Sequence, residues 1–324
     1  MKSKLFKIKG DASFRQFYRK KSNSKSTVVV YSKKEKIKNL LIYDAINKLL
    51  IKNKIFAPKL YNHLYKKNYI EIEDFGNHSV LDELKKQKKK NFLIFKKIIL
   101  LLKKIQKIKT RQIKNFNNKT YRVPLYSDKL LFNESKLFCD WYTRSVLPTK
   151  KKVIINKKIV KAIKHLIKNL KQKNNCFVHR DFHVSNLMIY KNNFGVIDSQ
   201  DAVIGNKAYD LASLIDDVRY QTSNNLKNKI YKNYITINKN NLNIKNFKND
   251  FDILSVLRNL KIIGIFTRLA KRDKKNKYLK LIPYTWKLIE MRLRDNPLLK
   301  DLKNILDKNF SNQLRKKIWK SKQL

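Results

Sequence analysis

The sequence predicts an α+β fold of two lobes: a small β-rich lobe over residues 1–75 and a larger, mainly α-helical lobe over residues 76–324. Short β-branched or alternating segments, which are typical of strands, are concentrated in the first of these ranges. Longer segments with apolar residues three and four apart, which are typical of amphipathic helices, follow. Residues 176–201 interrupt the helical segments with a loop and a β-hairpin, so strands and helices are largely segregated along the chain.

Strand signals define the first lobe. Residues 10–19 predict a strand, a turn and a second strand, and the β-branched segment 27–31 predicts another strand. Apolar residues at helical spacing predict a helix over residues 37–51. Residues 69–76 alternate between apolar and polar and end in glycine, so we expect a strand that leads into a turn. We place the boundary between the lobes after this strand.

Helical spacing dominates the second lobe. Ser79 is followed three residues later by Asp82, a pair that can cap the start of a helix. Apolar residues repeat through residues 92–108 with lysines on the other face, which predicts a long helix that packs on a core. A basic amphipathic helix can also lie on an anionic membrane, and that alternative stays open here. Further helices are predicted over residues 133–142, 153–170, 208–214, 255–269 and 278–286.

The composition limits the class of protein. A chain of 324 residues with 42% hydrophobic residues can bury a large core, which excludes a disordered polymer. The formal net charge of +53 is typical of nucleic-acid-binding proteins. However, the lysines are spread over the whole length, and asparagine and isoleucine, which AT-rich codons also encode, are common. Because no RRM, KH, helix-turn-helix or zinc-finger pattern is present, we favour compositional drift and expect no specific nucleic-acid partner.

Cysteine usage and hydropathy indicate a cytoplasmic protein. Cys139 and Cys176 are too few for a disulfide framework, which suits a reducing compartment. The first ten residues lack the apolar core of a signal peptide. The most apolar segment, residues 92–102, contains Lys96 and Lys97 and is too short to span a bilayer, so we expect no membrane segment. The sequence carries no signal for an oligomeric state.

The segment from Cys176 to Asp201 carries the most specific pattern in the chain. An apolar strand end is followed by His179-Arg180-Asp181, and Asn186 comes five residues after the aspartate. Residues 187–190 and 194–197 then predict the two strands of a hairpin. Asp198 follows the second strand, so a loop and a hairpin bring two carboxylates and an amide to one end of a small sheet.

These three side chains suit phosphoryl transfer from ATP. The pattern H-R-D-x-x-x-x-N is the catalytic-loop signature of protein kinases. Asp181 can accept the proton of an attacking hydroxyl and orient it, which makes it the candidate catalytic residue. Asn186 and Asp198 offer the hard oxygen ligands that Mg²⁺ on ATP phosphates requires. The second acidic motif departs from the D-F-G form of protein kinases, because it reads Asp198-Ser199-Gln200-Asp201.

That departure, together with the second histidine in HRDFH, resembles the aminoglycoside phosphotransferase and choline kinase superfamily. The segments GDASFR, HRDFHVSNLM, GVIDSQDAVIG and AYDLASL together are most similar to its bacterial anomeric sugar kinases of cell-wall recycling. Those enzymes phosphorylate N-acetylmuramate and N-acetylglucosamine at the anomeric hydroxyl. The resemblance runs in patches from about Gly10 to about Pro297. It implies a bilobal protein-kinase-like fold, the cofactors ATP and Mg²⁺, and a small-molecule sugar substrate.

The resemblance also implies a nucleotide site in the first lobe. In kinases the loop between the first two strands covers the phosphates with backbone N–H groups, whereas the pattern alone also fits an ordinary hairpin turn. A lysine on the third strand is usual in kinases, but residues 27–31 contain none. Arg15, Arg19 and Lys33 are the candidates for the replacing cation. The residues expected to bind ATP are Ala12, Ser13, Phe14 and Arg15 in the loop, and Glu73 and Phe75 beside the adenine.

Other residues are implied to bind the acceptor. The segment 133–142 matches one that lines the sugar site in the resembled group, where carboxylates accept hydroxyl hydrogen bonds and indole stacks on the sugar ring. From the pattern alone, the same segment reads as a core stripe with surface acids. The residues expected to bind substrate are Glu134, Asp140, Trp141, His183 and Asp201.

Three alternatives remain beside this interpretation. Cys176, His179 and His183 could ligate zinc, although a structural site requires a fourth ligand, and bracing of the catalytic loop is the simpler role for His179. The acceptor could be an aminoglycoside, choline or homoserine rather than an amino sugar. The chain could also be a basic nucleic-acid-binding protein that has lost catalysis, which the intact Asp181, Asn186 and Asp198 set disfavours.

Overall fold

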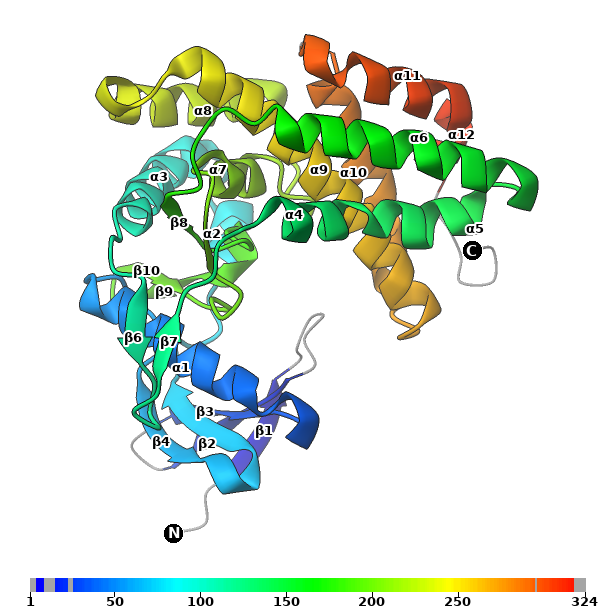
Figure 1. Ribbon diagram of the computed structural model, residues 1–324. Coiled ribbons are helices and arrows are strands. Elements are labelled where there is room, and N and C mark those ends of the chain that lie inside the picture. Colours follow the sequence, from blue (N-terminus) through cyan, green and yellow to red (C-terminus); the bar gives the residue numbers. More distant parts are fainter. Residues whose placement is uncertain (1–3, 9–14, 23–25, 295, 318–324) are drawn as a thin grey trace. The chain divides into compact units, whose positions relative to one another are not determined.

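The computed structural model describes residues 4–8, 15–22, 26–294 and 296–317 (Figure 1). The predicted fold class is confirmed: the strands form a small antiparallel sheet near the N-terminus, and most of the remaining chain is helical. No helix in these ranges is both long and apolar enough to cross a membrane. Both cysteines are buried and free.

Packing divides the chain into two compact units. Unit 1 contains residues 1–125 and 175–204, and unit 2 contains residues 126–174 and 205–324. The segment 175–204 belongs to unit 1 because its hairpin packs on the N-terminal part of the chain: the Val196 amide donates to the Phe56 carbonyl at 2.7 Å. The boundary between a β-rich and a helical lobe after residue 75 stays a prediction.

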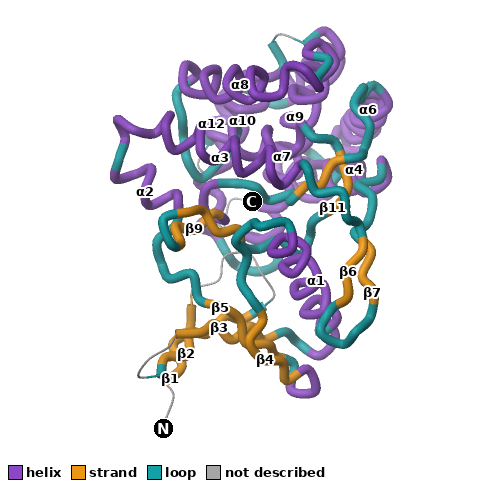
Figure 2. The backbone as a smooth tube through the Cα atoms, turned by 90° about the vertical axis from the view of Figure 1, so that its left-hand side faces the viewer, coloured by secondary structure: helices purple, strands orange, loops and turns teal. Residues whose placement is uncertain are grey.

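Unit 1 is built on a five-stranded antiparallel sheet, whose strands lie side by side in the order β1-β2-β3-β5-β4 (Figure 2). The strands are β1 (Lys4–Ile8), β2 (Gln16–Lys21), β3 (Ser26–Tyr31), β4 (Leu60–Leu64) and β5 (Tyr69–Glu73). The β-branched segment 27–31 forms β3, which lies between β2 and β5, as β-branched side chains pack well on a pleated surface. β1 contains two lysines and is largely exposed, which suits an edge strand.

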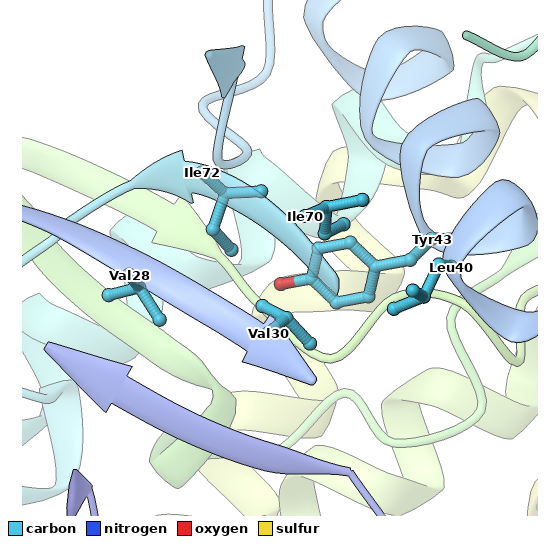
Figure 3. Packing of buried hydrophobic residues seen from close by; sticks show 6 residues of the cluster. All are labelled: Val28, Val30, Leu40, Tyr43, Ile70 and Ile72. Atoms are coloured by element: carbon cyan, nitrogen blue, oxygen red, sulfur yellow. The ribbon is translucent and has the colours of Figure 1, made fainter. Parts of the chain in front are cut away.

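Helix α1 (Lys38–Lys52) covers one face of this sheet. Strand alternation directs every second side chain of β3 and β5 toward the helix. Figure 3 shows the resulting core, in which Val28, Val30, Ile70 and Ile72 of the sheet meet Leu40 and Tyr43 of α1. Burial of each aliphatic side chain contributes roughly 1.5–3 kcal/mol. This core therefore fixes α1 against the sheet.

The rest of unit 1 supports the segment of the kinase-type motif. Helix α2 (Val80–Lys86) begins with the predicted capping box, in which the Ser79 and Asp82 side chains and backbone amides bond reciprocally. Helix α3 (Asn91–Gln106) follows and contacts β8. The short strands are β6 (Gln112–Lys114), β7 (Thr120–Arg122), β8 (Cys176–Val178), β9 (Leu187–Tyr190), β10 (Asn193–Val196) and β11 (Val203–Gly205).

The predicted β9–β10 hairpin is confirmed. Tyr190 pairs directly with Asn193, which leaves a two-residue turn. Both turn residues, Lys191 and Asn192, have positive φ angles of 48° and 58°. This is the conformation of a type I′ turn, whose twist matches that of the flanking strands.

Unit 2 is helical. Its helices are α4 (Asp128–Ser135), a π-helical segment (Phe138–Thr143), α5 (Arg144–Val146), α6 (Thr149–Lys168), α7 (Ala208–Ile215), α8 (Asn224–Asn238), α9 (Ile244–Lys271), α10 (Ile282–Arg292), α11 (Lys300–Asn309) and α12 (Asn312–Lys316). The 28-residue helix α9 is buried on most sides and contacts α4, α7, α10 and the π-helical segment, so it is the central element of this unit (Figure 1).

Gly264 lets α9 approach the π-helical segment closely. A Cβ atom at this position would lie 2.3 Å from the Leu137 carbonyl carbon and 2.4 Å from its oxygen. These contacts are to backbone, which cannot rotate away as a side chain can. Only glycine therefore fits at this crossing.

Candidate active site

The loop after β8 is held in place by its first residue. The buried His179 places Nε2 3.1 Å from the carbonyl oxygen of Ile197, so this nitrogen carries a proton and donates to it. The bond joins the loop to the strand end just before Asp198. The bracing role expected for His179 is therefore confirmed.

The next residues form a tight, internally bonded turn that positions Asn186. The His183 amide donates to the Asp181 carbonyl at 3.0 Å, and the Asn186 amide donates to the His183 carbonyl at 2.9 Å. The side-chain Nδ2 of Asn186 also donates to the Asp181 carbonyl, at 3.0 Å. Because the amide nitrogen is used in this way, the oxygen Oδ1 is the atom left to serve as a ligand.

Asp198 is connected to the same turn through the backbone. The Ile197 amide donates to the Asn186 carbonyl at 3.1 Å, so Asp198 follows a residue that is bonded to Asn186. Unit 1 thus brings together Asp181, Asn186 and Asp198. The loop-and-hairpin arrangement predicted from residues 176–201 accounts for this pairing.

Two residues of this segment, Arg180 and Asp198, have left-handed backbone conformations. Arg180 has φ of 73° and Asp198 has φ of 60°. Aspartate tolerates this region because its short polar side chain can bond locally, whereas for arginine the conformation costs about 1 kcal/mol or more. The Arg180 guanidinium compensates by donating to the Asp201 carbonyl at 3.0 Å. Such conformations cluster at functional sites, where they aim side chains.

Charges of both signs meet at Asp198. Burial raises the pKa of this carboxyl, the nearby guanidinium of Arg15 opposes the shift, and the carboxylates of Asp181 and Asp201 add to it. Arg15 Nη2 lies 2.6 Å from Asp198 Oδ1, and the Asp198 side chain remains 38% exposed. A cluster of carboxylates with partial exposure is electrostatically suited to bind a cation.

The donor set fits magnesium bound jointly with phosphate. Asn186 Oδ1 and the Asp198 carboxylate are hard oxygen ligands, and Mg²⁺ is usually held by one or two such groups plus substrate phosphates. Within the described ranges, no three His, Cys, Asp or Glu side chains are grouped closely enough to hold a metal by themselves. Cys176, His179 and His183 accordingly do not form the alternative zinc set.

The residues expected beside adenine lie on β5 and just after it. The Glu73 amide is used in the sheet, where it donates to the Lys59 carbonyl at 2.8 Å, and its carboxylate accepts a 2.5 Å bond from Tyr190. The buried Phe75 stacks on Tyr190 with ring centroids 4.3 Å apart. A Cβ atom at Gly195 would lie 2.5 Å from the Phe75 ring, so this aromatic side chain is fixed between β9 and β10.

Of the expected phosphate loop, Ala12, Ser13 and Phe14 lie outside the described residues. Arg15 is described and is buried, with Nη1 donating to Gln200 Oε1 at 2.7 Å. Gln200 in turn donates to Asp201 Oδ2 at 2.8 Å. Sequence reasoning did not identify Gln200 or Tyr190 as site residues, because no local pattern distinguishes them.

The residues expected to bind the acceptor are distributed over both units. His183 and Asp201 belong to unit 1, with the kinase-type motif, whereas Glu134, Asp140 and Trp141 belong to unit 2. Their roles therefore stay predictions.

Within unit 2, the buried Glu134 accepts a hydrogen bond from Tyr126 and pairs with Lys261 at 3.1 Å. Asp140 pairs with Lys136 at 2.8 Å, one helical turn away. Asp140 and the partly exposed Trp141 lie in the π-helical segment (Phe138–Thr143) rather than in the regular helix that the spacing predicts. Such segments are frequent at functional sites, because the extra residue changes which side chains share a face.

Comparisons with known proteins match the chain to one family and to curated relatives. The model of a family described as "Phosphotransferase enzyme family" matches residues 5–235. The N-acetylmuramate/N-acetylglucosamine kinase of Pseudomonas aeruginosa is 25% identical over 312 residues, which cover 94% of this chain and 88% of that protein. The enzyme of the same name from Neisseria meningitidis is 25% identical over 283 residues, which cover 84% of this chain and 80% of that protein.

Solved structures show a shared fold. The gentamicin complex of APH(2")-IIa has a TM-score of 0.62 and 15% identity, and the match covers 91% of this chain and 93% of that chain. The ethanolamine kinase of Plasmodium vivax has a TM-score of 0.60 and 14% identity, and the match covers 90% of this chain and 82% of that chain. At these identities the likeness establishes the fold alone.

Proposed function

Because the chain belongs to the phosphotransferase enzyme family, we propose that it transfers the γ-phosphoryl group of ATP to the anomeric hydroxyl of N-acetylmuramate or N-acetylglucosamine, in cell-wall recycling. The convergence of Asp181, Asn186 and Asp198 carries the proposal for the reaction. The names of the curated relatives, matched over most of the chain, support the acceptor. Since ATP is a cytoplasmic nucleotide, we place the reaction there.

In the proposed reaction, the acceptor oxygen forms a bond to the γ-phosphorus while the bond from phosphorus to the bridging oxygen breaks and ADP leaves. The proton of the acceptor passes to the Asp181 carboxylate, which also fixes the direction of attack. Asn186 and Asp198 would hold Mg²⁺, which neutralises charge on the phosphates when bound. Little covalent chemistry is left for the protein, so positioning and electrostatics dominate.

The ATP site is proposed to consist of two parts. Backbone groups near Glu73 and Phe75 bind the adenine, and the loop residues Ala12, Ser13, Phe14 and Arg15 also bind ATP. The rigid placement of Phe75 against Tyr190 and Gly195 supports a preformed wall for a planar base.

The sugar is proposed to bind to five residues: His183, Asp201, Glu134, Asp140 and Trp141. The Glu134 carboxylate, which contacts Tyr126 and Lys261, is a hydrogen-bond acceptor of the kind that sugar hydroxyls require. The i,i+4 pair of Asp140 with Lys136 is worth only a few tenths of a kcal/mol and can be exchanged for a ligand.

A panel of acceptors tests this proposal. Purified protein is incubated with ATP, Mg²⁺ and N-acetylmuramate, N-acetylglucosamine, choline, ethanolamine, homoserine or an aminoglycoside, and each product is analysed for the mass of one added phosphoryl group. We expect turnover of the two amino sugars. Phosphorylation of the anomeric oxygen also blocks ring opening, so the product must lose its reducing-sugar reactivity.

The 1-O-methyl glycoside of N-acetylglucosamine is the matched control, because it lacks only the anomeric hydroxyl. Phosphorylation of this glycoside would refute the proposed position of transfer. Turnover of choline, homoserine or an aminoglycoside in place of the sugars would assign the enzyme to another acceptor within the same family.

A further inference from the structure

Strand β3 lacks the cation that kinases usually place there. In protein kinases, a lysine on the third strand pairs with the nucleotide phosphates and with a glutamate of the following helix. Here β3 reads Ser-Thr-Val-Val-Val-Tyr, and the only acidic residue of α1 is Asp44, which pairs with Lys48 at 2.9 Å. Both halves of that pair are therefore absent, and a different group must supply the charge.

Two of the three candidate cations, Arg19 and Lys33, do not contact Asn186 or Asp198. Arg19 on β2 forms a bidentate pair with Asp74, at 2.6 Å from Nε and 2.8 Å from Nη2, and also donates to the Gly76 carbonyl. Lys33 is exposed and lies in the turn that precedes α1. Neither contacts the residues proposed to hold the metal.

Arg15 differs from both. Only 5% of its surface is exposed. Its two terminal nitrogens donate to different residues of the second acidic motif: Nη2 to Asp198 Oδ1 at 2.6 Å and Nη1 to Gln200 Oε1 at 2.7 Å. The guanidinium carbon lies 5.3 Å from the centre of the Tyr43 ring. A planar guanidinium held by two hydrogen bonds and an aromatic face has little freedom to move.

The contact leaves the metal-binding role of Asp198 intact. Arg15 uses Oδ1, and within the described part of the chain Oδ2 accepts no hydrogen bond. The same carboxylate can therefore face a cation with one oxygen and Arg15 with the other. Arg15 is also the residue that directly follows the expected phosphate loop at 12–14.

We propose that Arg15 is the cation that replaces the third-strand lysine of this kinase, that it binds the β- and γ-phosphates of ATP, and that Gln200 is its positioning residue. The inference rests on the proposed use of ATP. It also explains the departure from D-F-G. Gln200 stands where that motif has glycine, and its side-chain oxygen accepts a hydrogen bond from Arg15 Nη1.

Helix α1 is coupled to this arrangement without a glutamate. Tyr43 supports the guanidinium through its ring, and burial raises the pKa of Tyr43 to about 12, so the phenol stays neutral. One turn later, Asn47 accepts a buried 2.8 Å hydrogen bond from Ser199. The second acidic motif is thus connected to α1 at two points, through the contact of Arg15 with Tyr43 and through the bond from Ser199 to Asn47. These two contacts replace the lysine–glutamate pair of protein kinases.

The test measures nucleotide binding without chemistry. Dissociation constants for ADP and adenosine are determined by calorimetry in EDTA and in Mg²⁺, with no acceptor, for wild type, Arg15→Gln, Arg15→Lys and Gln200→Leu. Because adenosine has no phosphates, its affinity should not change in any variant. We expect Arg15→Gln to weaken ADP binding roughly 10- to 100-fold, also in EDTA, since hydrogen bonds to charged groups are worth about 1.5–3 kcal/mol. Arg15→Lys should retain part of the ADP affinity. Gln200→Leu should weaken ADP binding by a smaller factor than Arg15→Gln does.

Lys33→Gln is the control, since it removes an exposed candidate cation. Unchanged ADP affinity in Arg15→Gln would overturn the inference, as would equal losses for ADP and adenosine, which indicate a purely structural role. If Arg15→Gln does not fold, Gln200→Leu decides the matter by the same comparison. Failure of wild type to bind ADP or to phosphorylate any acceptor would refute the proposed function instead, so the two failures are distinguishable.

Discussion

Replacing Gly264 by alanine should destabilise unit 2, although alanine is the better helix former. In the interior of a helix, alanine is favoured over glycine by about 0.8–1.0 kcal/mol. Against this, the added Cβ would lie 2.3 Å from the Leu137 carbonyl carbon, about 1 Å inside ordinary contact, so α9 and the π-helical segment must separate. Overpacking of this kind typically costs about 1–3 kcal/mol and occasionally more. After the gain in helix propensity is subtracted, we expect a net loss of up to about 2 kcal/mol.

Urea denaturation followed by tryptophan fluorescence measures this effect. Trp141 and Trp286, the two tryptophans in the described part of the chain, both lie in unit 2 and report on its unfolding. The urea midpoint of Gly264→Ala should fall, and that of Gly264→Ser should fall further. Since the contact is with backbone, adding Leu137→Ala should not restore the midpoint. A Gly264→Ala midpoint above that of wild type would refute the steric argument.

Three further predictions concern charged groups. Asp181→Asn should lower kcat on the order of 10²–10⁴-fold while nucleotide affinity measured by calorimetry is retained; unchanged turnover would remove Asp181 from the mechanism. Asp198→Ala should abolish Mg²⁺-dependent phosphoryl transfer in a coupled ADP-release assay, and full activity would refute the metal role. Burial alone would raise the pKa of Asp216, but Arg292 and Lys227 lower it below its ordinary value. The stability from this group is therefore fully present above the unfolded pKa of about 3.9 and is lost as pH falls through the folded value. Urea midpoints between pH 6 and pH 3 should decline more in wild type than in Asp216→Asn, and equal slopes would contradict the assignment. At neutral pH, Asp216→Asn should cost about 3–5 kcal/mol, because it leaves two cations buried without a carboxylate.

The sequence predicts elements well where a local pattern determines them. The Ser79 capping box, the β9–β10 hairpin and the amphipathic helix α3 all depend on residues a few positions apart. Strands of three residues such as β6 and β7 are too short to show an alternation, so they were not predicted. Helix α9 is predicted only over residues 255–269, its C-terminal part, since a helix that is buried on most sides has no polar face to mark its length.

The same distinction holds for the site. The spacing of Asp181, Asn186 and Asp198 is a local signature, and the structure brings these residues together as the loop and hairpin require. The contact of Arg15 with Asp198 joins residues 183 positions apart, and no periodicity or spacing encodes it. The π-helical segment likewise begins where the backbone at Leu137 and Phe138 meets Gly264, a long-range contact, so helical spacing over residues 133–142 does not predict it.

The discontinuity of unit 1 has a consequence for how the chain folds during its synthesis. Its sheet and α1 lie within residues 1–125, but the hairpin that packs on Phe75 begins only at Leu187. Until then, the Phe75 ring, which is buried in the folded protein, must be shielded by other means. A ribosome stalled at residue 170 would therefore display an intermediate with exposed apolar surface that chaperones bind. A ribosome stalled after residue 204 has left the exit tunnel would not.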